Sequence, residues 1–289
     1  MGLVDYWKRR AWHRDPEAIA ALKGTKPAVV ITGGSDGIGL ALARAFASAE
    51  HAAVLIARDP EKLKLARARI EAEFGQDNII VTLSQDITTQ QAPHNIRALL
   101  EQNDLFADIL INSAGVGTTG EFAAETPDKL SAMTKINVTA LTRLCREFLP
   151  DMLARGRGGL INVSSLGGFA PGPYQAAYYA SKSYVISLTR AIAHEVRGQG
   201  VRIATVAPGP VNTAFHARAE GETSLYRHIL PAMSPEQIAA SARRGYSLGQ
   251  TVIIPGLFSN ITAIAMRVLP AMLVSPVVAI LLKPRPPKG

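Results

Sequence analysis

Short apolar runs alternate with helical stretches along the first part of this chain, and this rhythm restricts the possible folds more than any other feature. Runs with the composition of buried strands lie at residues 28–32, 53–57, 78–83 and 108–112. Stretches of helical composition lie between them, at 38–49 and 61–74. Strands that are apolar along their whole length are typical of a sheet covered on both faces. The pattern therefore predicts βαβ units and a parallel sheet.

The same alternation continues downstream. We expect helices over 127–153 and 175–197, and strands over 159–163, 201–207 and 251–254. No shift in composition, internal repeat or low-complexity tract divides this region. The sequence therefore predicts an α/β fold with a doubly wound parallel sheet in one domain, 27–255. A basic extension, 1–26, precedes it, and an apolar helical extension, 256–289, follows it.

Composition excludes several classes of protein. Hydrophobic residues make up 47% of the 289 residues and charged residues 19%, which suits a folded core and argues against disorder. The single cysteine, Cys145, excludes an internal disulfide framework and a cysteine-rich zinc site. The six histidines have no metal-ligand spacing, so no metal is expected. The N-terminus has no apolar run typical of a signal peptide, which favours a cytoplasmic protein.

The net charge of +8 is concentrated at the ends of the chain. Residues 1–26 hold six cationic and three acidic residues, and the last seven residues add Lys283, Arg285 and Lys288. A nucleic-acid-binding domain would carry its basic residues on the folded part. We therefore expect no nucleic-acid partner.

A glycine-rich turn follows the first predicted strand. Residues 32–39 read Thr-Gly-Gly-Ser-Asp-Gly-Ile-Gly and stand between that strand and the next helix. Glycines allow main-chain N–H groups to approach a pyrophosphate closely, and the start of a helix adds a positive dipole end. The spacing is G-x3-G-x-G, which differs from the G-x-G-x-x-G pattern of other dinucleotide-binding turns.

This turn resembles the TGxxxGIG motif of the short-chain dehydrogenase/reductase family, and three later motifs agree with it. Asn112-Ser113-Ala114-Gly115 is similar to the family's NAG element, with Ser113 in place of a second Asn. Tyr178 and Lys182 match Y-x3-K, and Pro208-Gly209 match the PG turn. The resemblance covers about residues 28–255. It implies a Rossmann-type sheet of seven strands, a nicotinamide cofactor and a homodimer or homotetramer.

The resemblance also implies where the cofactor lies. Its phosphates would face Gly33, Ser35, Gly37, Ile38 and Gly39, its adenine Asp86 and Ile87, and its carboxamide Thr213. The rest of the expected cofactor site consists of the strand-end and active-site residues Asn112, Ala114, Gly115, Tyr178, Lys182, Pro208 and Gly209.

The end of the second strand bears on the choice between NAD and NADP. NAD-binding folds usually place an acidic residue there to bind the ribose 2′-hydroxyl. This chain has Ala57 followed by Arg58, and a guanidinium can bind a 2′-phosphate through two charge-assisted hydrogen bonds. Arg58 could instead be an ordinary solvated charge. The sequence favours NADP(H).

Four residues are candidates for catalysis. Tyr178 and Lys182 lie at i and i+4 of the helix over 175–197, so they share a face. A nearby ammonium is expected to lower the pKa of the tyrosine, which would act as general acid or base. Ser165 follows the strand 159–163, where a hydroxyl can bind a substrate oxygen, and alternation turns Ser164 the other way. By the resemblance, Asn137 completes a tetrad.

The predicted function is interconversion of a carbonyl and a secondary alcohol with NADP(H), by hydride transfer. The segment 212–234 corresponds to the family's substrate lid, and its Phe215, Leu225, Tyr226, Ile229 and Leu230 suggest a hydrophobic substrate or a lid that docks through them. A 3-oxoacyl thioester reductase and a non-catalytic NADP(H) sensor are the alternatives. The complete set of Ser165, Tyr178 and Lys182 argues against a sensor.

The C-terminal extension has one charge, Arg267, between residues 245 and 282. Prolines interrupt its apolar run, so two short helices are expected rather than one that spans a membrane. The extension could pack on the domain, enlarging the substrate pocket or a subunit interface, or lie on an anionic membrane as a peripheral anchor. We favour packing on the domain.

Overall fold

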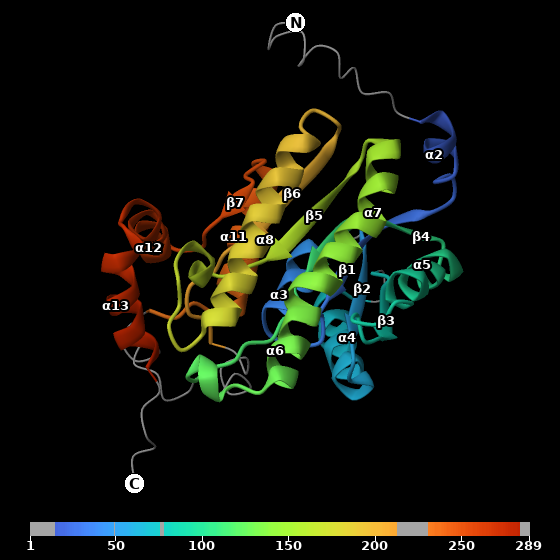
Figure 1. Cartoon of the computed structure of the whole chain (residues 1–289). Coiled ribbons are helices and arrows are strands. Elements are labelled where there is room, and N and C mark those ends of the chain that lie inside the picture. The colour runs from blue at the N-terminus through green and yellow to red at the C-terminus, as the bar shows by residue number, and fades with distance from the viewer. Residues whose placement is uncertain (1–14, 49, 76–77, 213–230, 284–289) are drawn as a thin grey trace, which may run out of the picture.

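Seven parallel strands form one sheet in the computed structural model, which describes residues 15–48, 50–75, 78–212 and 231–283. Their order is β3-β2-β1-β4-β5-β6-β7 (Figure 1). The strands are β1 (Lys26–Thr32), β2 (Ala52–Ala57), β3 (Ile80–Ser84), β4 (Leu105–Asn112), β5 (Gly158–Val163), β6 (Val201–Val206) and β7 (Val252–Ile253). The order reverses at β1, between β2 and β4. The predicted doubly wound Rossmann-type sheet is confirmed.

Helices cover both faces of the sheet, which explains the unbroken apolar strands. One face carries α3 (Gly37–Phe46), α4 (Pro60–Phe74) and α11 (Pro235–Ser247). The other carries α5 (Ala92–Gln102), α7 (Leu141–Arg155) and α8 (Ala176–Glu195). Along β1, Val29 and Ile31 face the first layer, whereas Ala28 and Val30 face the second, and none of these four side chains is exposed.

The single helix predicted over 127–153 is divided by a π-helical segment. The chain runs through α6 (Pro127–Thr134), the π segment η2 (Lys135–Ala140) and α7 without leaving the helical axis. Residues in a π segment follow i→i+5 spacing, which changes the direction in which a side chain points. Asn137 lies in this segment and binds the backbone of Val116, outside its own helix. This geometry could not be predicted from helical composition.

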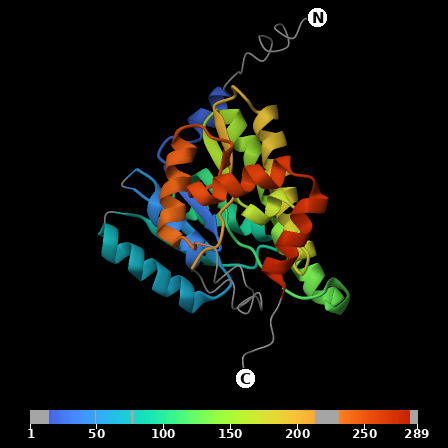
Figure 2. The ribbon, with the colours of Figure 1, turned by 90° about the vertical axis from the view of Figure 1, so that its left-hand side faces the viewer.

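The C-terminal extension forms two helices, α12 (Leu257–Val268) and α13 (Ala271–Leu282). Pro270 separates them as expected, but Pro276 lies inside α13 and does not end it. Val274, Val278 and Leu282 pack on Ala170 and against Tyr174 and Tyr179. The extension therefore docks on the domain, and Figure 2 shows both helices at the surface on that side. None of the helices that the structure describes is both long and apolar enough to cross a membrane.

Candidate active site

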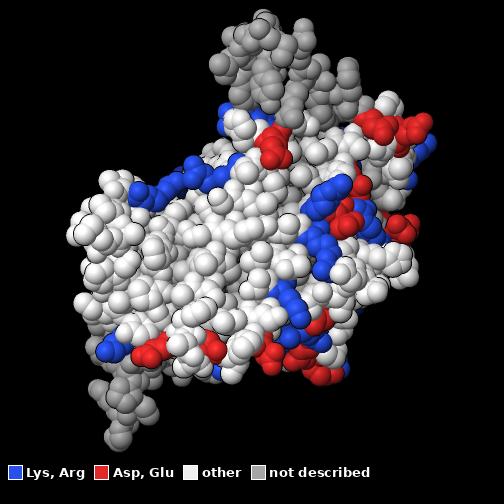
Figure 3. Space-filling model, in the orientation of Figure 1, with Lys and Arg blue, Asp and Glu red and all other residues white. Residues whose placement is uncertain are grey.

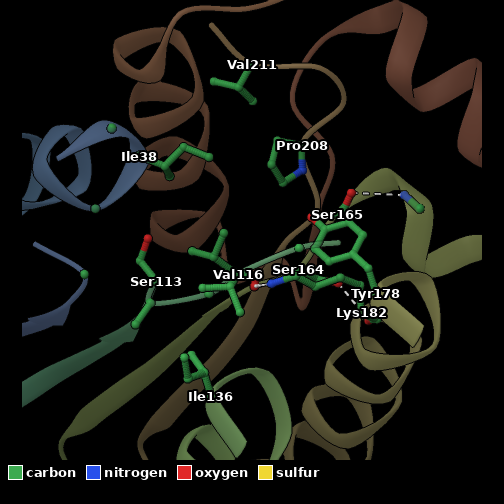
Figure 4. Close-up of a pocket in the computed structure, with 18 of the residues that line it drawn as sticks. Ile38, Ser113, Val116, Ile136, Ser164, Ser165, Tyr178, Lys182, Pro208 and Val211 are labelled. Carbon is green, nitrogen blue, oxygen red and sulfur yellow. Dashed lines mark hydrogen bonds between the residues drawn. The ribbon is translucent and has the colours of Figure 1, made fainter. Parts of the chain in front are cut away.

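A cavity of about 860 Å³ opens along the carboxyl ends of the strands. This is the edge where ligands of open α/β sheets bind. The cavity brings together most of the residues predicted for the cofactor and for catalysis (Figure 4). Those that line it are Gly33, Ser35, Gly37, Ile38, Gly39, Arg58, Asp86, Ile87, Ala114, Gly115, Ser165, Tyr178, Lys182, Pro208 and Gly209.

The glycine-rich turn is packed so closely that side chains would not fit. Gly33 has a φ of +68°, and a Cβ atom on Gly39 would lie 2.1 Å from the carbonyl oxygen of Gly33. Asp36 caps α3 by accepting a hydrogen bond from the N–H of Gly37. The turn therefore brings the start of α3 directly against β1, and its backbone lines the cavity as a phosphate-binding turn requires.

The loop after β4 is held against this turn. The hydroxyl oxygen of Thr32 accepts hydrogen bonds from the N–H groups of Ser113 and Ala114, at 3.1 and 3.2 Å. A Cβ on Gly33 would lie 3.0 Å from the backbone of Ala114. The glycine-rich turn after β1 and the loop after β4 are therefore in direct contact, and both line the cavity.

Two exposed cations line the cavity beyond β2: Arg58 directly after the strand and Lys62 in the first turn of α4. Asp59 lies between them in the sequence, but its carboxylate caps α4 by accepting from the N–H groups of Glu61 and Lys62. At the end of β3, Asp86 accepts from the N–H and the hydroxyl of Thr88. These bonds, chiefly the backbone bond from Thr88, lower the pKa of Asp86, and the charge of Arg58 contributes. Both carboxylates are therefore committed to hydrogen bonds within their own turns.

Ser165 and Tyr178 also line this cavity, and they lie side by side (Figure 4). Ser165 follows β5 in an extended conformation and accepts a hydrogen bond from the N–H of Gly167. Burial raises the pKa of the Tyr178 phenol to about 12, while a hydrogen bond with Ser165 acts in the opposite direction. The phenol is thus protonated at neutral pH and suited to donate a proton. The predicted lowering of this pKa by Lys182 is not seen: the cause that lowers it is the hydrogen bond with Ser165, and burial outweighs that bond.

Lys182 is buried one helical turn from Tyr178, and its Nζ atom lies 5.7 Å from the centroid of the tyrosine ring. The ammonium donates a hydrogen bond of 3.1 Å to the carbonyl oxygen of Val163, at the end of β5. Burial lowers the pKa of Lys182 to about 8. Ser164 turns away from Ser165, as alternation predicts, and donates to the carbonyl oxygen of Lys182. Ser164 therefore supports α8.

The neighbouring tyrosine, Tyr179, is held by packing. Its ring lies against Gly167 and Gly172, where a Cβ would come within 2.8 and 2.2 Å of ring atoms. It meets the ring of Tyr178 edge-on, with centroids 6.2 Å apart. Tyr179 lines the cavity next to α13, whereas Tyr178 carries the hydrogen bond with Ser165.

Two of the predicted site residues that the structure describes do not line the cavity. Asn137 is buried behind it and binds both backbone groups of Val116 and the Ser181 hydroxyl, so it fixes the loop after β4. Asn112 is also buried, and its amide donates to Asn162 and to the sulfur of Cys145. The structure thus places Asn112 in the core between β4 and β5, where its side chain does not reach the cavity. Thr213 lies outside the described residues.

The sequence did not single out several residues that line the cavity. The amide of Gln175 is buried and donates to Thr119. Side chains from α12 and α13 form an apolar wall, with Phe258, Met266 and Leu281 among them. The helical spacing of the extension predicted helices but not which face of each would meet the cavity. Residues 213–230 of the predicted lid lie outside the described residues.

The motifs and the geometry agree with known proteins. A family model described as short chain dehydrogenase matches residues 27–223. A short chain dehydrogenase of Pseudocercospora fijiensis is 35% identical over 202 residues, which cover 69% of this chain and 64% of that protein. A 3-ketodihydrosphingosine reductase of Bacteroides thetaiotaomicron is 32% identical over 187 residues, 65% of each chain. The matches thus span slightly less than two thirds of these relatives.

Solved structures show the same fold. The short-chain dehydrogenase of Sphingobium yanoikuyae in complex with NADPH superposes with a TM-score of 0.72 and 31% identity, over 80% of this chain and 88% of that one. The bulky-bulky ketone specific alcohol dehydrogenase of Comamonas testosteroni gives a TM-score of 0.69 and 28% identity, over 80% of this chain and 86% of that one. With its motifs in order around one cavity, this chain belongs to the short-chain dehydrogenase family.

Proposed function

We propose that this protein is an NADP(H)-dependent oxidoreductase that interconverts a carbonyl group and a secondary alcohol. The observation that carries the proposal is the juxtaposition of Ser165 and Tyr178, with Lys182 beside them, in a cavity that also contains the glycine-rich turn. A nicotinamide cofactor, when bound, supplies or accepts the hydride. The close approach of Gly39 to Gly33 leaves bare backbone at the cavity, as a bound pyrophosphate needs.

The protein's own residues would manage the proton and the substrate oxygen. Tyr178, which its raised pKa keeps protonated at neutral pH, donates its phenolic proton to the carbonyl oxygen in reduction and takes the proton back in oxidation. The hydroxyl of Ser165 lies beside the phenol, so it can donate to the same oxygen and stabilise its developing charge. The Lys182 ammonium balances charge near the phenol and would contact the cofactor's ribose.

Arg58 and Lys62 support the preference for NADP(H). Both are exposed and line the cavity, Arg58 directly after β2 and Lys62 in the first turn of α4, where a 2′-phosphate would lie, and Ala57 provides no carboxylate to compete with it. Asp59, the next residue in the chain, is engaged with the start of α4, and Asp86, whose charge interacts with that of Arg58, is engaged with Thr88. A guanidinium can bind a phosphate through two hydrogen bonds, whereas a ribose hydroxyl gains much less from it.

A hydrophobic substrate is supported by the apolar wall from α12 and α13. The names of two relatives, a bulky-bulky ketone specific alcohol dehydrogenase and a 3-ketodihydrosphingosine reductase, refer to substrates with large groups beside the carbonyl. A bulky apolar ketone or its alcohol is therefore the substrate class that we propose, ahead of a 3-oxoacyl thioester.

The test combines binding with turnover. We expect NADPH to bind at least about tenfold more tightly than NADH, and Arg58→Ala to remove that difference through loss of its charge-assisted bonds. Tyr178→Phe should lower kcat on bulky ketones by about a thousandfold while NADPH still binds, because it removes the proton donor. Tyr179→Phe is the matched control and should retain turnover. Equal binding of both cofactors would contradict the NADP preference. NADPH binding without turnover on ketones or 3-oxoacyl thioesters would favour the sensor.

A further inference from the structure

The outer surfaces of α12 and α13 form the largest gathering of exposed apolar side chains among the described residues. Ten of the sixteen large hydrophobic residues that are exposed lie between Leu257 and Ile280. On α12 the stripe is Leu257, Ile261, Ile264 and Val268, and on α13 it is Met272, Leu273, Val277 and Ile280. The six others are scattered over separate elements. We call these eight residues the apolar face.

The spacing of these residues shows that the face is a continuous feature of both helices. Positions 257, 261, 264 and 268 follow the i, i+4, i+7 and i+11 spacing that places residues on one side of a helix. The opposite side of α12 lines the cavity through Phe258, Thr262 and Met266. On α13, Val274, Val278 and Leu282 pack on the domain. Both helices thus carry apolar residues on two sides: the inner side meets the cavity and the domain, and the outer side is the apolar face.

The charges on α12 and α13 favour one kind of binding partner for the apolar face. Neither α12 nor α13 contains an acidic residue, and the charged residues on or directly after them, Arg267 and Lys283, are both cationic. Figure 3 shows a broad area over α12 and α13 that is largely free of charged side chains. An apolar stripe on helices whose own charges are cationic matches an anionic lipid surface. A symmetric contact with a second copy would bring these like charges together.

We propose that the apolar face of α12 and α13 binds the surface of an anionic membrane, with both helices lying in the plane of the interface. Each helix has 12 residues, about 18 Å of length, which is too short to span a hydrocarbon core of about 30 Å. Apolar side chains of an interfacial helix enter the boundary between headgroups and acyl chains, while cations contact the headgroups. Because α12 also lines the cavity, the apolar end of the cavity would then lie next to the bilayer.

The test measures vesicle binding and needs no turnover, so its outcome is separate from that of the proposed function. The full chain is sedimented with vesicles of phosphatidylcholine and phosphatidylglycerol, and with phosphatidylcholine alone. We expect binding to the anionic vesicles that weakens at high salt. Val268→Glu combined with Met272→Glu should weaken it by about tenfold or more, because both side chains are among the most exposed of the face.

Leu65→Glu combined with Leu248→Glu is the matched control, because these residues are similarly exposed but lie on α4 and after α11. This control should bind vesicles like the unmodified chain. Lys283→Gln should weaken binding by about fivefold, the effect of one cation at an anionic surface. Thermal melting of each variant verifies that it is folded.

Three results would overturn the proposal. One is absence of sedimentation with anionic vesicles. Another is an equal loss of binding in the Leu65 and Leu248 control. The third combines two observations: the unmodified chain does not bind vesicles, and in sedimentation velocity without lipid the Val268 and Met272 variant is a smaller oligomer than the unmodified chain. That result would make the apolar face an interface between copies of the chain.

Discussion

The glycine-rich turn between β1 and α3 and the helix pair α12 and α13 border the same cavity, yet they are built in different ways. In the turn, backbone meets backbone, and a single Cβ on Gly39 would collide with the carbonyl oxygen of Gly33. In the helix pair, apolar side chains such as Met266 and Leu281 form the wall. Backbone contacts tolerate almost no change, whereas a wall of side chains accepts substitution at a modest cost.

This difference suits two kinds of ligand. A dinucleotide is the same for every member of a family that uses it, so a rigid backbone turn can bind it. A substrate differs between members, and side chains can change without disturbing the sheet. The comparison therefore predicts that changes in the turn impair cofactor binding and that changes in the wall alter substrate preference.

The largest effect is expected in the turn. Gly39→Ala places a methyl group 2.1 Å from a backbone oxygen, so α3 has to move away from β1. We expect NADPH to bind about a hundredfold more weakly, in line with the upper range for overpacking. Calorimetric titration measures it. Gly34→Ala is the control, since its Cβ would lie 3.2 Å from its nearest neighbours and should have a much smaller effect. Similar losses in both variants would contradict the backbone argument.

The second effect concerns Lys182, which lines the same cavity, and the pH dependence of the unfolding free energy. Burial lowers its pKa to about 8 from 10.5, so between these values the unfolded chain holds a proton that the folded chain has released. Stability therefore rises with pH in this window. Relative to Lys182→Met, the cofactor-free protein should gain about 2 kcal/mol of unfolding free energy between pH 7.5 and 9.5. Urea unfolding at both pH values measures it. A constant difference between the two proteins would mean that Lys182 is not buried as described.

The smallest effect is expected in the wall. Met266→Ala removes part of the apolar lining contributed by α12. We expect KM for a bulky apolar ketone to rise about fivefold, from the loss of one or two buried methylene contacts, with NADPH affinity unchanged. Steady-state kinetics with a bulky and a small ketone separates the effects, because the small ketone should not respond. A parallel loss of NADPH affinity would show that the two regions are not independent.

Much of the fold could be predicted from local features. The apolar strands 28–32 and 53–57 and the glycines after the first strand have compositions that few other structures satisfy. The structure confirms the parallel sheet that they predict, and it gathers Ser165, Tyr178 and Lys182 in one cavity. Strand-end positions and helical i, i+4 spacing are local properties, which is why the arrangement of these three residues could be predicted.

Three features depended on contacts between distant segments. Asn112 was expected at the cofactor, but its amide binds Asn162 and Cys145 in the core. The π segment turns Asn137 to Val116, and burial by the surrounding protein raises the pKa of Tyr178, although a neighbouring lysine was expected to lower it. The direction of a side chain at a strand end and the polarity around a phenol are set by what packs against them.

The sequence by itself determined the order of the strands along the chain, the glycine-rich turn between the first strand and the first helix of the sheet, and the division of the C-terminal extension at Pro270, because each follows from neighbouring residues. Only the tertiary structure decided which sides of α12 and α13 are covered. An apolar helix carries no signal for which of its faces meets the domain, since hydrophobic burial has no direction of its own. Packing against Ala170 and Tyr179 made that choice, and it left the apolar face outward.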